Sequence, residues 1–351
     1  MPGAVYALSA AALFGASTPA AKLLLRDLSP LMLSALLYLG AAIALSVYRF
    51  LPAFESREAK VTRRDLPLMC GIIFSGGMLG PILMLLGLQR LSALTGSLLL
   101  NLEGPFTTLI AVGLMREHLG RREMFAAATI MLGGVLLSVQ AGHVGGSWVG
   151  ALEIAAACLS WGIDNNLTQR ISLRDPVAVA RIKTLAAGAC VLVIALWQGS
   201  EAIPGATNVV GAGAVGALCY GVSIVFDLKA LRVLGAARES AYFATAPFVG
   251  ALLSVAIFRD LPNSSELTGA ALMSIGVALL IRERHSHRHT HEVIFHEHLH
   301  IHDEHHRHEH DCLVAEPHSH PHEHSSLIHD HPHVSDSHHR HSHKLPKAER
   351  G

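Results

Sequence analysis

Ten apolar stretches, each about as long as a membrane-spanning helix, restrict this chain more than any other feature of its sequence. A helix needs about 20 apolar residues to cross the hydrocarbon core of a bilayer. Only 15% of the residues are charged, whereas typical soluble proteins carry about 25%. We therefore predict an all-α integral membrane protein with ten transmembrane helices. The predicted spans are residues 4–25, 31–50, 66–88, 92–115, 123–141, 148–168, 176–197, 208–228, 236–258 and 266–282.

Basic residues alternate along the connections between these spans, and this pattern predicts the orientation in the membrane. The connections after spans two, four, six, eight and ten hold clusters of Arg and Lys, whereas the others are nearly bare. Since cytoplasmic loops are rich in Lys and Arg, we expect a multi-pass protein of the cell (inner) membrane with cytoplasmic N- and C-termini. Lys and Arg together equal Asp and Glu, at 27 each, so no basic excess indicates nucleic acid as a partner.

The membrane part contains an internal repeat. A shift of 142 residues without gaps superposes the pairs Pro105/Pro247, Phe106/Phe248, Met131/Met273 and Gly134/Gly276. Each repeat holds five spans, an odd number, so the second copy is expected to be inverted in the membrane. Inverted repeats are typical of secondary transporters, whose substrate site lies near the midplane between the halves. We expect a first five-helix repeat over 1–141, a second over 142–284 and a tail over 285–351.

Four segments of the membrane part resemble a known family. They are LFGASTPAAKLLL (13–25), NLEGPFTTL and its continuation (101–139), SWGIDNNLTQR (160–170), and TAPFVGALL with its continuation (245–280). The sequence is similar here to the EamA family of the drug/metabolite transporter superfamily, and the resemblance covers residues 1–284. It implies ten helices and carrier-type transport, usually export, and it leaves the solute open. Glu117 matches an acidic position of the family, whereas the second repeat has Arg259-Asp260 there.

Glu103 is the most central acidic residue of the predicted spans. A charge at mid-membrane costs roughly 2.5–3.5 kcal/mol on insertion scales, so such a residue needs a reason. Glu103 lies halfway along the fourth span, between Asn101 and Pro105. Pro105 frees a backbone carbonyl one turn earlier, which brings a carboxylate, an amide and a carbonyl into one turn. This arrangement suits a hard cation or a proton. The alternative is a protonated Glu103 that hydrogen-bonds a neighbouring helix.

Asp164, Asn165 and Asn166 form the densest polar cluster of any predicted span. We expect Asp164 to pair with Lys22 or to ligate a cation, unless the cluster is only hydrated near the cytoplasmic interface. Glu153, one turn into the same span, is a candidate entrance residue. Lys22 either snorkels from the outer end of the first span or supplies a counter-charge. The candidate transport path therefore consists of Lys22, Asn101, Glu103, Glu153, Asp164, Asn165 and Asn166.

The composition changes abruptly after Arg284. Residues 285–351 hold 23 of the 25 His and too few apolar residues to bury a core, so we predict a tail that is disordered without metal. Neutral imidazole is a common ligand of zinc, copper, nickel and cobalt, and HxH spacing lets a flexible chain wrap one ion. A pH-sensing role is the alternative. The candidate metal ligands are His285, His287, His289, His291, His296, His298, His300, His302, His305, His306, His308, His310, His318, His320, His322 and His324.

These features predict a secondary carrier that exports a divalent transition metal and so gives metal resistance. Nickel and cobalt are favoured over zinc, because carriers with His-rich ends resemble nickel and cobalt resistance permeases. No GxxxxGK[ST] motif for ATP is present, so we expect coupling to protons, with Glu103 and Asp164 as candidate sites. The expected partners are the lipid bilayer and Ni, Co or Zn ions bound by the tail. No other cofactor is expected, and both a homodimer and import are left open.

Two other functions are consistent with the sequence. The first is an exporter of amino acids or other small metabolites, with the tail as an accessory metal buffer. Few carboxylates in the spans favour it, because a metal path needs several ligands. The second is a membrane-anchored metal buffer or sensor, for which ten spans are more membrane than an anchor needs. We find no nucleophile–base arrangement and no catalytic metal motif, so an enzyme is not expected.

Overall fold

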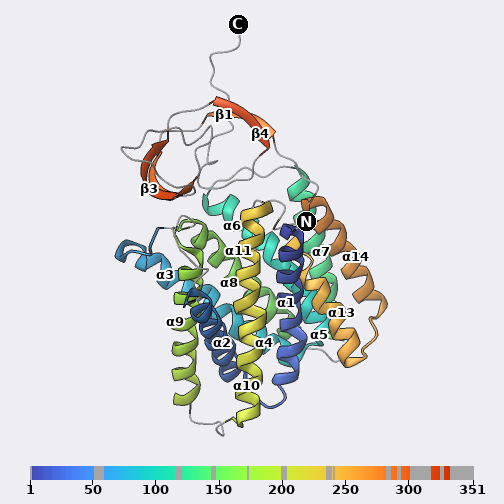
Figure 1. Cartoon of the computed structure of the whole chain (residues 1–351). Helices are drawn as coiled ribbons and strands as arrows, with labels where there is room; N and C mark the ends of the chain where they lie inside the picture. The colour runs from blue at the N-terminus through green and yellow to red at the C-terminus, as the bar shows by residue number, and fades with distance from the viewer. Residues whose placement is uncertain are drawn as a thin grey trace.

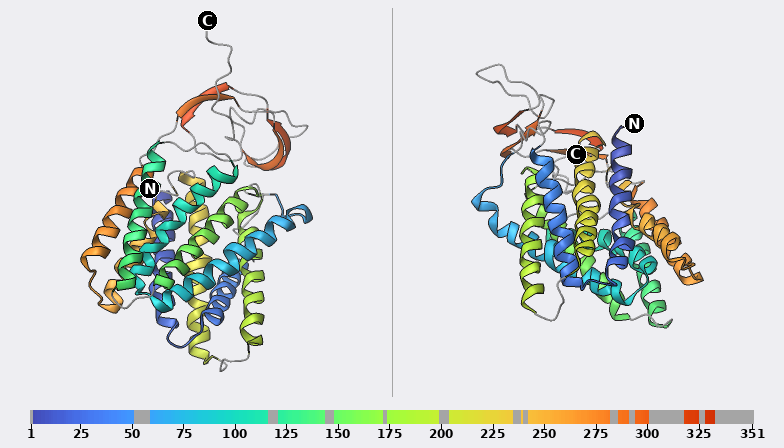
Figure 2. Two further views of the ribbon diagram at one scale, coloured as in Figure 1. Left: turned by 180° about the vertical axis from the view of Figure 1, so that it is seen from behind. Right: turned by 60° about the horizontal axis from the view of Figure 1, so that its bottom comes forward.

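A bundle of long helices forms most of the molecule, and four short strands lie beyond one of its ends (Figure 1). The N-terminus lies at the same end as the strands (Figure 2). The computed structural model describes residues 2–50, 59–115, 121–143, 148–171, 174–198, 204–234, 239, 242–281, 286–290, 294–300, 318–324 and 328–332.

Several of the helices continue into one another, with short turns of different pitch between them. The turns η1 and η3 are 3₁₀ helices, and η2 and η4 are π-helical turns. In chain order the described helices are α1 (Pro2–Leu24), α2 (Pro30–Phe50), η1 (Arg63–Asp65), α3 (Leu66–Ile72), η2 (Ile73–Leu79), α4 (Gly80–Arg90), α5 (Ala93–Leu99), η3 (Leu100–Leu102), α6 (Glu103–Met115), α7 (Arg121–His143), α8 (Trp148–Gln169), α9 (Pro176–Trp197), α10 (Ala206–Val215), η4 (Gly216–Val222), α11 (Ser223–Leu234), α13 (Ala246–Phe258) and α14 (Ser264–Ile281).

These helices cover the predicted spans, and most of their ends agree to within a few residues. Within the described residues, six helices are long and apolar enough to cross a membrane: Gly3–Leu24, Pro30–Phe50, Arg63–Arg90, Arg121–Val139, Pro176–Trp197 and Ala206–Leu231. The other four predicted spans are helical too. Two of them contain polar residues, namely α5–η3–α6 and α8, and the other two are the shorter helices α13 and α14. The bundle is therefore all-α, and the chain is a multi-pass membrane protein.

Large apolar side chains cover the outside of the bundle. Ile43, Val193 and Leu252 are 65%, 66% and 72% exposed, although each lies within a helix. In water such a surface would be an aggregation hazard, whereas against lipid tails it carries no cost. The packed interior is also apolar, with Leu33, Leu85 and other Leu, Ile and Met side chains fully buried. The bundle is thus apolar both on its outer surface and in its packed interior, as a protein in contact with the lipid bilayer requires.

Helices of the first half pack against helices of the second half in matched pairs. The third helix of each half lies on the first helix of the other, since α4 packs on α8 and α11 packs on α1. The second helices, α2 and α9, pack on each other, and so do the last helices, α7 and α14. These pairs join the two halves along most of their length (Figures 1 and 2).

Proline interrupts the fourth span of each half. In the first half, η3 lies immediately before α6, which contains Pro105. A proline lacks the N–H that the preceding turn would accept, so the helix loosens there, as predicted. Just before this proline, the thiol of Cys158 donates to the carbonyls of Leu99 and Leu100, at 3.6 and 3.8 Å. In the second half, Pro247 stands at the start of α13, directly after a turn.

Four short strands lie in the tail, among the residues that the structure describes, and the disorder of the tail without metal stays a prediction. β1 (Ser286–Thr290) pairs antiparallel with β4 (Ile328–Pro332), and β2 (Ile294–His300) pairs antiparallel with β3 (His318–His324). The alternation of His with other residues suits such strands. Its period of two residues is the period of a β-strand, so each strand carries its His on one face.

Candidate functional site

Six side chains from four helices lie close together in the bundle, and we call them the polar centre. Three of them are buried, Glu103 and Lys183 are partly buried, and Asn165 is exposed. Glu103 lies within electrostatic range of Asp164 and Lys183, and Tyr38 lies within range of both carboxylates. The polar centre consists of Tyr38 on α2, Glu103 on α6, Trp161, Asp164 and Asn165 on α8, and Lys183 on α9.

Glu103 is held by an amide from the neighbouring helix. The Asn165 side chain donates to Glu103 Oε1 at 2.8 Å and to Thr107 Oγ1 at 3.3 Å. The Asn166 amide donates to the Thr107 carbonyl at 3.0 Å and so fixes the same two helices together. The predicted neighbour Asn101 does not contact Glu103 in this way: it is buried and donates to the Leu98 carbonyl at 3.0 Å. The structure thus joins Glu103 to the cluster on α8.

Asp164 forms an ion pair with Lys183 and not with Lys22, which corrects one of the two expected roles. Asp164 is 4% exposed, and Lys183 reaches it from the adjacent helix α9. The Lys183 ammonium donates a hydrogen bond to one carboxylate oxygen, Oδ2. The other, Oδ1, is buried and has no hydrogen-bond partner among the described residues. An acceptor of this kind is costly to bury, so it is available to a further donor or cation.

The backbone of η2 forms one wall of the polar centre. The Gly76 carbonyl accepts two hydrogen bonds, from Tyr38 Oη at 2.9 Å and from Trp161 Nε1 at 3.1 Å. A Cβ atom on Gly76 would lie 2.1 Å from the Asp164 carboxyl carbon, so only glycine fits here. π-Helical turns are frequent at functional sites, because they leave backbone groups out of the regular ladder. This turn places such a carbonyl beside the Asp164–Lys183 pair.

Lys22 binds backbone carbonyls at the end of α4. Its ammonium donates to the Leu91 carbonyl at 2.8 Å and to the Leu88 carbonyl at 2.5 Å. The last carbonyls of a helix lack partners within the helix and carry a partial negative charge, which a Lys stabilises. Lys22 therefore ties α1 to the end of α4, away from the polar centre.

Glu153 pairs with Arg90 across α8 and α4, with 3.0 Å between Arg90 Nε and Glu153 Oε2. Arg90 is 40% exposed and Glu153 is 16% exposed, as side chains. The ion pair thus lies at an edge of the bundle and joins the two halves there. Of the predicted path, only Glu103, Asp164 and Asn165 belong to the polar centre.

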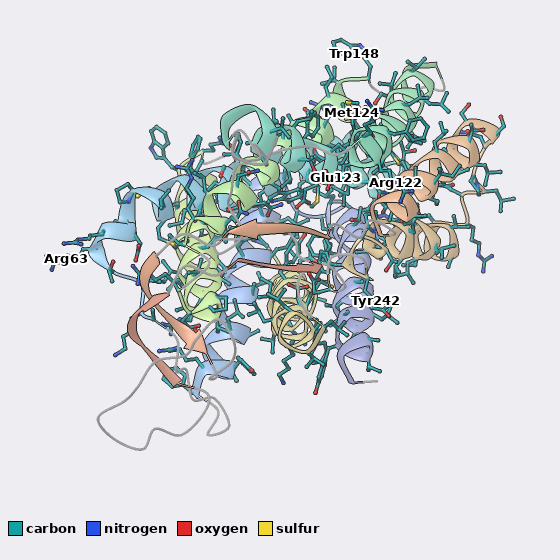
Figure 3. The ribbon with its side chains drawn as sticks, turned by 90° about the horizontal axis from the view of Figure 1, so that it is seen from above. Arg63, Arg122, Glu123, Met124, Trp148 and Tyr242 are labelled. Atoms are coloured by element: carbon teal, nitrogen blue, oxygen red, sulfur yellow. The ribbon has the colours of Figure 1, made fainter. Side chains whose placement is uncertain are left out.

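The three tryptophans differ sharply in their surroundings. Trp161 is 8% exposed and lies in the polar centre, whereas Trp148 and Trp197 are 62% and 87% exposed. Trp148 lies at the outer edge of the bundle when it is seen from above (Figure 3). Trp161 is therefore the natural optical reporter of the polar centre.

No group of three or more His, Cys, Asp or Glu that could hold a metal occurs within the described residues. In the tail, nine of the predicted metal ligands lie in β1, β2 and β3, and three cross-strand His pairs join β2 to β3. The pairs are His296 with His322, His298 with His320, and His300 with His318. The other predicted ligands, His285, His291, His302, His305, His306, His308 and His310, lie outside the described residues.

Lys183, Tyr38 and Trp161 belong to the polar centre and not to the predicted path. Lys183 falls within the predicted span 176–197. A lysine inside a span needs a partner, and this was a usable signal. Tyr38 gave no signal in the sequence, because an aromatic residue inside an apolar helix is ordinary core.

Comparisons with known proteins agree with this architecture. A family model described as the EamA-like transporter family matches residues 1–139 and 148–282. A curated relative from Methanothermobacter thermautotrophicus, described as an uncharacterized transporter, is 25% identical over 293 residues, which cover 79% of this chain and 85% of that protein. A solved crystal structure of a protein has the same fold, with a TM-score of 0.57 and 20% identity over 79% of this chain and 95% of that chain.

Proposed function

Because the chain belongs to the EamA-like transporter family, we propose that it is a secondary carrier that exports a divalent transition metal from the cytoplasm. Nickel or cobalt is the favoured cargo and zinc is the next choice. The carrier would lie in the cell inner membrane with both termini in the cytoplasm, and it would give the cell resistance to the metal. The alternation of basic connections supports this orientation.

The single observation that carries the choice of a metal is the His content of the tail. Residues 285–351 hold 23 of the 25 His of the chain. The register of β2 and β3 sets three His of one strand opposite three His of the other. Directly opposed residues of an antiparallel pair have Cβ atoms about 4.5–5.5 Å apart, a spacing that allows two imidazoles to share one ion. Such a tail would collect ions beside the bundle.

We propose two inverted repeats over 1–141 and 142–284, with the polar centre on the transport path. Support comes from the matched packing of α4 on α8 and of α11 on α1. Glu103 and Asp164 would act as the proton or cation sites, since both are carboxylates of the polar centre, Asp164 buried and Glu103 partly buried. A proton gradient would supply the energy.

Metal accumulation in bacterial cells that lack their own exporters tests this function. Cells with the full-length protein should hold less nickel or cobalt than cells with an empty vector. Glu103→Gln should abolish that difference, and Glu123→Gln at the start of α7 is the matched control that should retain it. Removal of the tail after Arg284 should weaken export without abolishing it. Unchanged nickel, cobalt and zinc contents, with the protein present in the membrane, would overturn the proposal.

An exporter of amino acids or other small metabolites is the second candidate, and specific observations favour it. Lys183 neutralises Asp164, and no cluster of metal ligands occurs among the described side chains. Aromatic rings also line up beside the polar centre, with ring centroids of Tyr38 and Tyr220 at 5.9 Å and of Phe14 and Tyr220 at 5.8 Å. Efflux of an organic solute in the absence of metal would decide for this candidate.

A further inference from the structure

Lys183 occupies one of the two carboxylates of the polar centre, that of Asp164. Asp164 projects from α8, and the Lys183 ammonium reaches it from α9. The pair rests on η2, where a Cβ on Gly76 would meet the Asp164 carboxylate. Gly76 thus leaves just enough room for the ion pair. Any cation that binds Asp164 Oδ2 must first displace the ammonium.

The charges of the polar centre give this competition a consequence. Glu103 and Asp164 are the two acidic groups and Lys183 is the one basic group, and the Asn165 amide that holds Glu103 is neutral. With both carboxylates ionised and Lys183 in place, the polar centre has a net charge of one negative. With Lys183 withdrawn its net charge is two negative, which a divalent cation would neutralise. A buried carboxylate without a counter-charge is strongly unfavourable, so the ammonium and the cation each stabilise the site when the other is absent.

The two partners differ in their freedom to move. The Asp164 side chain is 5% exposed, whereas the Lys183 side chain is 20% exposed and hangs on a flexible four-carbon stem. Asp164 Oδ1 has no hydrogen-bond partner among the described residues, so a cation could bind there before Lys183 leaves Oδ2. The geometry therefore suits replacement of one positive charge by another without an uncompensated intermediate.

We propose that Asp164, together with Glu103, binds a divalent cation and that Lys183 is a tethered cation that competes for the same carboxylate. The ammonium compensates Asp164 in the empty carrier and displaces the ion when it is to be released. This inference rests on the proposed function for its ligand, a divalent metal, and it adds a residue and a release step to that function.

Quenching of Trp161 fluorescence by Co²⁺ tests the proposal on the full-length protein in detergent. The chain has three Trp, so replacement of Trp148 and Trp197 by Phe leaves Trp161 as the only fluorescent Trp. Lys183→Gln should lower the Co²⁺ concentration for half-maximal quenching about tenfold, because the site no longer has to release a competitor. Lys183→Arg keeps a positive charge beside Asp164 and should therefore bind Co²⁺ as weakly as the unmodified chain does. Lys229→Gln, a lysine that lies over Tyr6 and Tyr48, is the matched control and should have no effect.

Asp164→Asn should remove the saturable quenching altogether, although its tail still binds Co²⁺. The double variant Asp164→Asn with Lys183→Gln removes both charges together, so a folded double variant that also lacks saturable quenching excludes misfolding as the cause. Equal or weaker binding in Lys183→Gln than in the unmodified site would overturn the proposal, and so would normal quenching in Asp164→Asn.

Flux separates this inference from the proposed function. Lys183→Gln should bind Co²⁺ more tightly and yet export it several-fold more slowly, since the ion is no longer displaced. If Co²⁺ quenches Trp161 as described but cells with the full-length protein hold as much metal as cells with an empty vector, the cation site is supported and the proposal of metal export is wrong. If Asp164→Asn exports metal as well as the unmodified chain does, metal export stands and this site is wrong.

Discussion

At the scale of the residue, glycine decides how closely the third helix of each half approaches its neighbours. A Cβ on Gly76 would lie 2.1 Å from the Asp164 carboxylate, and one on Gly216 would lie 2.0 Å from the Leu37 carbonyl oxygen. Both distances are far below van der Waals contact, and packed interiors yield little. Gly104 is the opposite case, because nothing lies within 4 Å of its added Cβ. The sequence distinguishes none of these glycines.

Gly76→Ala should therefore destabilise the protein, by about 1–3 kcal/mol, because overpacking of a tight site forces the neighbouring helix away. It should also weaken Co²⁺ binding, since the wall of the polar centre moves. Gly104→Ala adds the same methyl group to the same bundle and should leave the melting temperature unchanged or raise it, as Ala favours a helix. Thermal unfolding of both variants in detergent checks this, and equal melting temperatures would contradict it.

At the scale of the element, the sequence predicts a helix well and its partner poorly. Apolar length predicted ten spans, and Pro105 predicted the break in the fourth span, because both effects act within a short stretch of chain. The pairing of Asp164 with Lys183 depends on the packing of α8 against its neighbours, which no local pattern contains. The same limit explains why Lys22 was a reasonable partner for Asp164 and yet binds the end of α4.

The start of α9 is an element whose stability divides into two separable contributions. The Asp175 carboxylate caps the helix by accepting from the N–H groups of Val177 and Ala178, at 3.0 and 3.1 Å. The same carboxylate pairs with Arg49 at 3.0 Å and so joins α9 to the end of α2. Caps are worth about 0.5–2 kcal/mol, whereas a partly exposed ion pair is worth about 0–1 kcal/mol.

Asp175→Ala should therefore destabilise the chain more than Asp175→Asn does, because Asn still caps the helix and loses only the charge. Arg49→Gln removes the ion pair and keeps the cap, so it too should destabilise the chain less than Asp175→Ala does. Melting temperatures of the three variants give the comparison. If Asp175→Asn were as unstable as Asp175→Ala, the ion pair would be the larger contribution and this division would be wrong.

At the scale of the whole molecule, the two halves are alike in packing and unlike in polarity. A shift of 147 residues superposes Trp161-Gly162 on Phe14-Gly15 and Asp164 on Ser17. The carboxylate is thus present on α8 and absent from α1, which packs against α11 as α8 packs against α4. A scaffold with matched halves can offer two alternative openings at similar free energy, while a single polar centre binds the solute. The difference between halves is therefore where selectivity for the solute would lie.

Inversion of the halves makes equivalent connections face opposite sides of the membrane, and this can be measured with matched cysteines. Ser56→Cys and Ser200→Cys lie in the connections between the second and third helices of the first and second halves. The exposed Cys70 and Cys190 and the tail residue Cys312 must be replaced first, so that the new thiol is the reactive one that is measured. With cytoplasmic termini, a membrane-impermeant thiol reagent added to intact cells should label Cys at 200 and not at 56, and permeabilised cells should label both. Equal labelling of the two positions in intact cells would mean that the halves are parallel. The two halves could not then open the polar centre to the two sides of the membrane in turn by an inversion-related movement.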